Sequence, residues 1–212
     1  MNLQEKEVQY STKNSYSTLN QNTSKTKNVW FVFHGMGYLS KYFLKYFKGL
    51  PPVDNYIIAP QAPSKYYIQP KMHVGANWLT RDNTEAGVEN IMNYLDEILA
   101  FENISDDKNI ILFGYSQGVS IISRLVAKRQ LKCDILVLHS GGIPVELTNE
   151  DFEFLPIETK VKLICGKQDQ YLTTERIDLE SQRAKDLFGE RLEIVLFEGK
   201  HEVNVDYINN LI

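Results

Sequence analysis

Six short apolar runs recur along this chain, and each is followed within a few residues by glycine or proline. Val, Ile, Leu and Phe dominate the runs, with little of the polar alternation expected of a strand that has one face in solvent. Such runs are typical of strands buried on both faces of a parallel sheet. We therefore predict strands over residues 28–33, 55–59, 109–113, 133–138, 161–165 and 192–197.

Helical patterns separate most of these runs. The longest, over residues 84–101, has apolar side chains at helical spacing and acidic residues on the opposite face. Alternating strands and helices predict an α/β fold with a mostly parallel central sheet and helices on both faces, built as one domain over residues 1–212 without a large lid domain. A weaker pattern over residues 7–19 predicts an antiparallel hairpin, which with the loop after it fills residues 1–27. Shorter helical patterns cover residues 39–48, 120–128, 174–188 and 203–211. Thr173 or Thr174 is placed to cap the helix over residues 174–188.

The pentapeptide GYSQG at 114–118 fits the pattern G-x-S-x-G and lies between a predicted strand and a predicted helix. A sharp turn from strand to helix places the central serine in a strained conformation with its hydroxyl exposed. The two glycines remove side chains where strand and helix crowd together. The context therefore predicts Ser116 as a nucleophile.

A serine hydroxyl needs a neighbouring base to act as a nucleophile. In the α/β-hydrolase fold an acid and then a histidine base follow the serine along the chain. Asp169 lies four residues past the run 161–165, and His201 lies four residues past the run 192–197. Both fall at the carboxyl ends of strands, where the active sites of such sheets lie. We predict His201 as the general base and Asp169 as the acid that orients it.

His139 is the alternative base, and Asp178 and Glu198 are the alternative acids. His139 comes before the strand that carries the acid, too early for the order of this fold, and we interpret it as a hydrogen-bonded histidine at a strand end. Asp178 falls inside a helical pattern and Glu198 is almost adjacent to the base, so we interpret both as solvated surface charges.

An oxyanion hole for the reaction needs two backbone N–H groups. One should come from Gln117, the residue after the nucleophile, and the other from the loop after an earlier strand. The sequence HGMG at 34–37 occupies that loop, and its glycines let the backbone approach a substrate closely. We predict the Met36 N–H as the second donor, and His34 as a hydrogen bonder that orients the loop.

Together these motifs resemble the phospholipase/carboxylesterase group of α/β-hydrolases, compact serine esterases related to acyl-protein thioesterases. The resemblance implies the same triad and the same two oxyanion donors. It departs at Tyr38, where relatives often carry Asp, and over residues 62–83, which have no close counterpart. The matching segments lie between about residues 29 and 201: FHGMG at 33–37, IIAPQAP at 57–63, the segment around Trp78, FGYSQG at 113–118, HSGGIP at 139–144, GKQD at 166–169 and GKH at 199–201.

The segment 64–81 is rich in aromatic and apolar side chains and should cross the rim of the active site. These side chains suit the wall of a pocket for an acyl or aromatic group; alternatively they anchor a long loop. We expect Tyr38, Tyr67 and Trp78 to contact the substrate. Without a large lid, the site should be open and shallow, and suited to short or exposed acyl groups.

Charge and composition exclude several other classes of protein. The net charge of −4 leaves no broad basic field for nucleic acid or anionic membrane, and no apolar run reaches the roughly 20 residues that span a bilayer. Neither a nucleotide-binding glycine motif nor a metal-ligand spacing occurs among the four histidines and two cysteines, so we expect no cofactor and no metal. We interpret Cys133 and Cys165 as buried free thiols, which favours a cytoplasmic location.

The sequence thus predicts a serine hydrolase that cleaves carboxylic esters or thioesters through an acyl-enzyme. Two alternatives remain open. One is a non-catalytic protein that uses the same fold to bind a small ligand, since fold alone does not fix function. The other is an acyltransferase or peptidase that uses the same triad.

Overall fold

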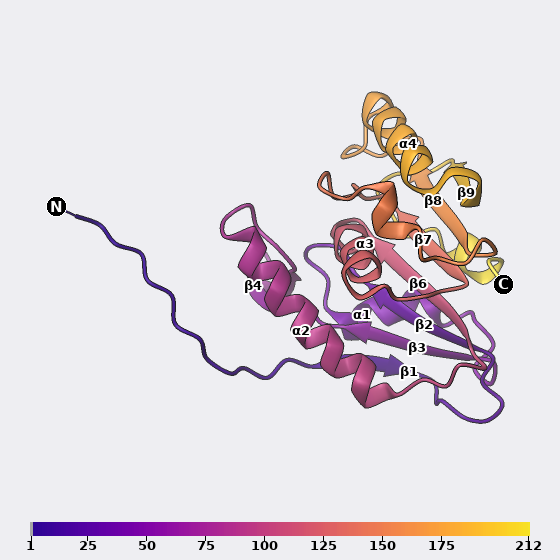
Figure 1. The fold of residues 1–212 in the computed structure, drawn as a ribbon, viewed down its shortest axis with the longest axis horizontal. Coiled ribbons are helices and arrows are strands. Elements are labelled where there is room, and N and C mark those ends of the chain that lie inside the picture. Colours follow the sequence, from indigo (N-terminus) through magenta and orange to yellow (C-terminus); the bar gives the residue numbers. More distant parts are fainter. Residues whose placement is uncertain (1) are drawn as a thin grey trace.

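A twisted seven-stranded sheet forms the centre of the computed structural model, which describes residues 2–212 (Figure 1). Its strand order is β1-β3-β2-β6-β7-β8-β9, with β1 antiparallel to β3 and all other neighbours parallel. The strands are β1 (Tyr16–Leu19), β2 (Asn28–Phe33), β3 (Asn55–Pro60), β6 (Asn109–Tyr115), β7 (Ile135–His139), β8 (Lys160–Gly166) and β9 (Leu192–Phe197).

The six predicted strands are confirmed, two of them with identical bounds and the others within two residues. Every residue of β2 and β3 is buried, as expected for strands covered on both faces. The prediction of full burial is wrong for β9, which lies at the edge of the sheet and exposes Glu193 and Leu196. A strand at the edge of a sheet has a neighbouring strand on one side only, so its side chains are covered less and are more exposed to solvent.

Helices cover both faces of the sheet, as predicted (Figure 1). The side chains of α2, α3 and α4 contribute to one hydrophobic cluster, and those of α1, the 3-10 turn after it and α5 contribute to the cluster on the opposite face. The Thr173 hydroxyl accepts a hydrogen bond from the Arg176 N–H and so caps α4, as expected. The helices are α1 (Ser40–Phe43), continued by a 3-10 turn (Leu44–Phe47), α2 (Thr84–Glu102), α3 (Gln117–Arg129), α4 (Thr174–Phe188) and α5 (Val205–Asn209), with further 3-10 turns at Asn149–Phe152 and Gly189–Arg191.

The predicted N-terminal hairpin is wrong. Residues 2–15 form no strand and are mostly exposed, and in Figure 1 they extend away from the rest of the molecule. Only β1 pairs, and its partner is β3 rather than an upstream strand. Tyr16 and Leu19 pack against the hydrophobic clusters from the edge of the sheet, whereas the polar residues before them have no apolar surface to bury.

The segment after β3 forms an antiparallel hairpin of β4 (Ser64–Ile68) and β5 (His73–Asn77). A pair of backbone hydrogen bonds connects it to the loop that follows β2. The Gly37 N–H donates to the Ala76 carbonyl at 2.8 Å, and the Ala76 N–H donates to the Tyr38 carbonyl at 3.2 Å. The hairpin therefore supports the loop that follows β2.

Because β3, β2, β6, β7, β8 and β9 are parallel neighbours in the central sheet, their carboxyl ends meet at one edge of it. Ser116, Asp169 and His201 follow β6, β8 and β9 at that edge. Among residues 2–212, no helix is both long enough and apolar enough to cross a bilayer.

Candidate active site

Ser116 stands at a sharp turn between β6 and α3. Its φ of 53° and ψ of −118° lie in a region that costs a non-glycine residue of order 1–3 kcal/mol. A Cβ at Gly118 would collide with the Phe33 carbonyl oxygen, so glycine is needed where α3 begins against β2. The Ser116 N–H donates to the His139 carbonyl at 2.8 Å, which fixes the turn to β7.

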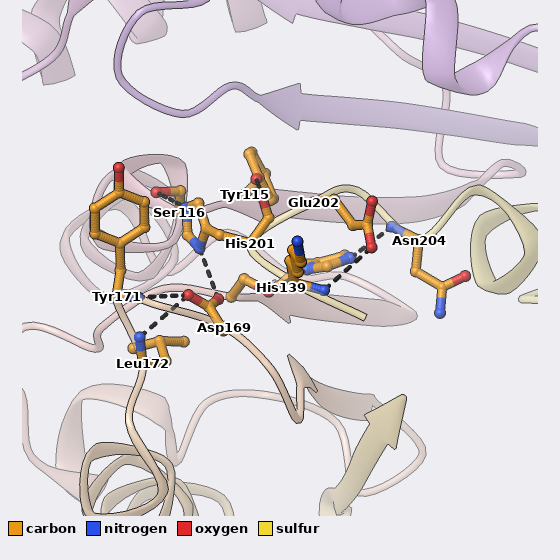
Figure 2. A network of polar contacts seen from close by, with 11 residues as sticks. Tyr115, Ser116, His139, Asp169, Tyr171, Leu172, His201, Glu202 and Asn204 are labelled. Atoms are coloured by element: carbon orange, nitrogen blue, oxygen red, sulfur yellow. Dashed lines mark hydrogen bonds and ion pairs between the residues drawn. The ribbon is translucent and has the colours of Figure 1, made fainter. Parts of the chain in front are cut away.

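The Ser116 hydroxyl is the first member of a hydrogen-bonded line of three side chains (Figure 2). Its Oγ lies 2.9 Å from Nε2 of His201, and Nδ1 of His201 lies 2.7 Å from Oδ2 of Asp169. If the Nδ1 proton is donated to the carboxylate, Nε2 has a free lone pair directed at the serine hydroxyl. The arrangement is therefore able to take the hydroxyl proton.

The Asp169 carboxylate is held by backbone groups as well as by the histidine. Its side chain has no exposed surface, and Oδ1 accepts hydrogen bonds from the N–H groups of Tyr171 at 2.8 Å and Leu172 at 3.1 Å (Figure 2). Oδ2 is left for His201. Two backbone donors stabilise a buried negative charge that would otherwise be costly.

Aromatic side chains fix the position of His201. The Tyr115 hydroxyl donates to the His201 carbonyl at 3.0 Å, and the Tyr115 ring packs against the imidazole with a centroid separation of 5.3 Å. Tyr171 packs edge-on against the same imidazole at 4.9 Å and is 71% exposed, so it flanks the His201 ring on the solvent side. The sequence analysis missed Tyr171; its place two residues after the acid was the available signal.

His139 is fully buried and holds the loop that carries His201. Its Nε2 accepts the Asn204 N–H at 3.0 Å, and its Nδ1 lies 3.0 Å from the Ser140 hydroxyl (Figure 2). Burial, reinforced by the nearby His201, lowers the pKa of His139 to about 3. It is a neutral strand-end histidine with both ring nitrogens engaged, which agrees with the interpretation from the sequence.

The loop after β2 brings a second set of groups to the serine. If Gly35 carried a Cβ atom, that atom would lie only 3.0 Å from the Ser116 Cβ. The loop therefore passes very close to Ser116. Within residues 2–212, the backbone N–H groups of Met36 and Gln117 have no hydrogen-bond acceptor. Unpaired donors beside a nucleophile are what an oxyanion hole requires.

His34 holds this loop in place through two hydrogen bonds. Its Nδ1 lies 2.8 Å from the Gly35 carbonyl, and its Nε2 accepts the Ala62 N–H at 3.2 Å. Burial lowers the pKa of His34 to about 4, so the ring is neutral near pH 7 and the Nδ1 proton is donated to Gly35. This is the loop-orienting contact expected of His34.

The Gln117 side chain has a structural role that the sequence analysis did not predict. Its Oε1 accepts the Trp78 N–H at 2.9 Å, and its Nε2 donates to Asn77 Oδ1 at 2.7 Å and to the Leu79 carbonyl at 2.8 Å. The start of α3 is thereby tied to the end of the β4–β5 hairpin, which itself holds Gly37.

The three expected substrate contacts occupy different places. Trp78 is only 2% exposed, and its indole N–H donates to the His34 carbonyl at 2.8 Å, so it lies behind the loop rather than on a pocket wall. Tyr38 is half-buried, and its hydroxyl lies 3.0 Å from that of Tyr46. Tyr67 is 63% exposed on β4. Of the three, only Tyr38 and Tyr67 have exposed surface that a molecule arriving from solvent can contact.

The alternative acids lie on the surface. Asp178 is exposed on α4, and the exposed Glu198 pairs with Lys167 at 2.6 Å. Cys133 and Cys165 are buried free thiols, and burial raises the pKa of each to about 12. Neither cysteine is therefore suited to act as a thiolate.

Comparison with known proteins gives one family and many similar folds. A family model described as phospholipase/carboxylesterase matches residues 14–212. No curated protein matches the chain.

Three solved structures resemble it over most of their length. Acyl-protein thioesterase 2 of Zea mays has a TM-score of 0.70 at 14% identity, with 94% of this chain and 96% of that chain covered. A phospholipase/carboxylesterase of Dyadobacter fermentans has a TM-score of 0.66 at 16% identity, covering 95% and 97%. A Bacillus cereus carboxylesterase has a TM-score of 0.65 at 13% identity, covering 93% and 91%. At these identities the likeness is one of fold, and the fold is that of the α/β-hydrolases.

Proposed function

This chain belongs to the phospholipase/carboxylesterase family, and from that premise we propose that it is a serine hydrolase acting on carboxylic esters or thioesters through an acyl-enzyme. The family and the α/β-hydrolase fold indicate an ester or thioester hydrolase. The finer part of the proposal is the assignment of Ser116, His201 and Asp169 to the chemistry. One observation carries it, namely the continuous hydrogen-bonded line from Asp169 through His201 to Ser116.

The first half of the reaction forms the acyl-enzyme. Ser116 Oγ attacks the carbonyl carbon while His201 Nε2 takes the hydroxyl proton. The negative charge that develops on the carbonyl oxygen is stabilised by the N–H groups of Met36 and Gln117. The bond from carbon to the leaving oxygen or sulfur then breaks, and His201 returns its proton to that atom.

The second half repeats these steps with water. His201 removes a proton from a water molecule, the resulting hydroxide attacks the acyl carbon, and the bond to Ser116 Oγ breaks as His201 protonates that oxygen. Asp169 stays ionised throughout, holds the imidazole in the required tautomer and stabilises the imidazolium. Tyr38 and Tyr67 are proposed contacts for the substrate. Trp78 is proposed to position the loop between β2 and α1, residues 34–39, which we call the oxyanion loop.

We also propose a cytoplasmic location. The support for it is the state of Cys133 and Cys165, which are both buried as free thiols. Free thiols of this kind persist where the compartment is reducing.

The proposal is tested by hydrolysis of 4-nitrophenyl esters of increasing chain length and of matched acyl thioesters, with wild type and Ser116→Ala. We expect turnover by wild type and a loss to near background in Ser116→Ala, with the melting temperature changed little because alanine keeps the Cβ and removes only the Oγ of a partly exposed side chain. Ser120→Ala, a serine on the next turn of α3, is the matched control and should retain activity.

Other outcomes separate the alternatives. Absence of turnover by wild type across the panel, together with saturable binding of an ester, would favour a non-catalytic ligand-binding protein. Transfer of the acyl group to an added alcohol or amine in preference to water would favour an acyltransferase. Full activity in Ser116→Ala would exclude Ser116 as the nucleophile.

A further inference from the structure

A hollow of about 780 Å³ opens beside the oxyanion loop, between that loop and the β4–β5 hairpin. We call it the cationic hollow. The residues that line it include Tyr38, Lys41, Lys65, Ile68, His73 and Val74. The proposed chemistry at Ser116 uses none of these except Tyr38.

The cationic hollow is linked to Ser116 by the loop that follows β2. Its inner rim includes Gly37, and Gly35 is the residue whose Cβ position lies 3.0 Å from the Ser116 Cβ. Two residues of chain span at most about 7 Å. A group bound to Ser116 thus needs to extend only a short distance past Met36 to enter the hollow.

The strand order decides which half of a substrate can reach it. The oxyanion loop follows β2, and the hairpin follows β3, on one side of β6 in the sheet. Asp169 and the loop that carries His201 follow β8 and β9, on the other side. The leaving group must stay within reach of His201, which protonates it, so the side of β2 and the hairpin is left for the rest of the substrate, and the acyl half is assigned to that side in the proposal below.

The charge of the hollow is one-sided. Lys41 and Lys65 line it together with His73, and within the described chain no aspartate or glutamate is among its lining residues. Ser15, Ser17 and Ser40 also line the hollow, and the Ser17 and Ser40 hydroxyls are hydrogen-bonded to each other at 2.9 Å. A chain with net charge −4 thus places two lysines and no acid around a hollow beside its proposed nucleophile.

Apolar side chains lie among these polar groups. Ile68 and Val74 from the hairpin and Leu39 from the oxyanion loop line the same hollow. An alkyl stem can pack on such side chains while a charged end meets the lysines, because amphipathic groups divide themselves in this way.

We propose that the cationic hollow binds the far end of the acyl group and selects acyl chains that end in an anionic group, as in half-esters and half-thioesters of dicarboxylic acids. The inference rests on the proposed function and adds to it a class of substrate. Lys41 and Lys65 are its specificity-determining residues, and neither takes part in the chemistry at Ser116.

The test compares three thioesters of the same thiol and of matched acyl length: adipoyl, its ω-methyl ester and heptanoyl. The first has an anionic end, the second a polar neutral end and the third an apolar end. We expect kcat/KM for the adipoyl thioester to exceed that for the methyl ester in wild type. In Lys41→Gln/Lys65→Gln the ratio should fall about tenfold, because the variant lacks two exposed positive charges that each add a small attraction to the anionic end of the acyl group.

Two controls accompany this comparison. Lys185→Gln, an exposed lysine on α4 outside the hollow, should leave the ratio unchanged. Raising the salt concentration should reduce the ratio in wild type and have little effect in the double variant, because salt screens exposed charges.

The failure of each proposal has a different signature. An equal kcat/KM for all three thioesters, or an undiminished ratio in Lys41→Gln/Lys65→Gln, overturns the role of the cationic hollow while the esterase activity stands. A lack of turnover of heptanoyl and adipoyl thioesters alike by wild type argues against the proposed function itself.

Discussion

The two sides of Ser116 are built in opposite ways. On the side of β8 and β9, the contacts are made by side chains: His201 is hydrogen-bonded to the Ser116 hydroxyl, Asp169 is hydrogen-bonded to His201, and backbone N–H groups hold the carboxylate. On the side of β2 and the β4–β5 hairpin, the side chains of His34 and Gln117 hold backbone groups, and the backbone N–H groups of Met36 and Gln117 are the proposed donors to the substrate.

This difference explains which residues of the site can be predicted from the sequence. A side chain that does chemistry must be of one type, so its identity and its position after a strand are informative. A backbone N–H that does chemistry comes from any residue, and the informative residues are those that hold it. The comparison also predicts that variants on the first side abolish catalysis, whereas variants on the second side weaken it through geometry.

The largest effect is expected from Asp169→Asn, which keeps the size of the side chain but offers His201 an amide. The amide favours the wrong imidazole tautomer, and in a serine protease this change lowers turnover about 10⁴-fold. We expect a fall of that order in kcat for an activated ester. Asp178→Asn, at an exposed position on α4, is the matched control. Near-normal activity in Asp169→Asn would remove Asp169 from the site and direct attention to Glu198.

A smaller loss is expected from Gln117→Ala, which keeps the backbone N–H but removes the three hydrogen bonds of the side chain to the end of the hairpin. A displacement of about 1 Å in a catalytic group can cost roughly 10²-fold. We expect kcat to fall by about that factor with KM changed much less. Gln182→Ala, on exposed α4, is the control. An unchanged kcat would mean that the oxyanion loop holds its position without this brace.

A still smaller loss is expected from His139→Leu, which removes the acceptor for the Asn204 N–H beneath the His201 loop. An unpaired buried N–H costs about 1–3 kcal/mol. We expect stability in urea to fall by that amount and kcat to fall about tenfold because the loop shifts. His139→Gln restores a neutral acceptor and should recover part of both. Equal losses in the two variants would assign the effect to packing.

Both sides of the site depend on a buried neutral histidine, so acid should weaken both. Burial lowers the pKa of His34 to about 4 and of His139 to about 3, against about 6.5 in an unfolded chain. Below pH 6.5 the unfolded state therefore binds more protons, and the free energy of unfolding falls as pH falls. The contribution is complete above pH 6.5, and by pH 5 the loss is about 2 kcal/mol for each histidine.

Urea denaturation at pH 7 and pH 5 measures this dependence. In His139→Gln the loss of stability between the two pH values should be about half of that in wild type. A wild-type stability that does not change between pH 7 and pH 5 would contradict the neutral, buried state of the two rings.

The six buried strands could be predicted from the sequence because each is a continuous apolar run, and the helices because their periodicity is strong. The β4–β5 hairpin could not, since Ser64 to Tyr67 are all exposed and carry no alternation that distinguishes a strand from a loop. The error at the N-terminus has a related cause. Tyr16–Leu19 is a short edge strand whose partner, β3, lies about 40 residues away in the sequence.

The candidate site followed the same rule. Ser116, Asp169 and His201 were predicted from residue type and order along the chain, and the structure brings their side chains within hydrogen-bond distance of one another. Trp78 was expected on a pocket wall because aromatic residues in a rim segment are ambiguous, and its 2% exposure depends on a contact with His34 that no local pattern encodes. The edge-on packing of Tyr171 on His201 is likewise a contact between two loops.

The central claim is that Ser116 carries the acyl group, and mass spectrometry of the acyl-enzyme tests it most directly. Wild type is mixed briefly with a 4-nitrophenyl ester, quenched in acid and digested. The account predicts an initial burst of nitrophenol close to one equivalent when deacylation is the slower half, and an acylated peptide whose modified residue is Ser116. A fluorophosphonate, which forms a stable adduct, should label the same residue and leave Ser116→Ala unlabelled. Acylation or labelling at any other residue, with Ser116 unmodified, would contradict the account.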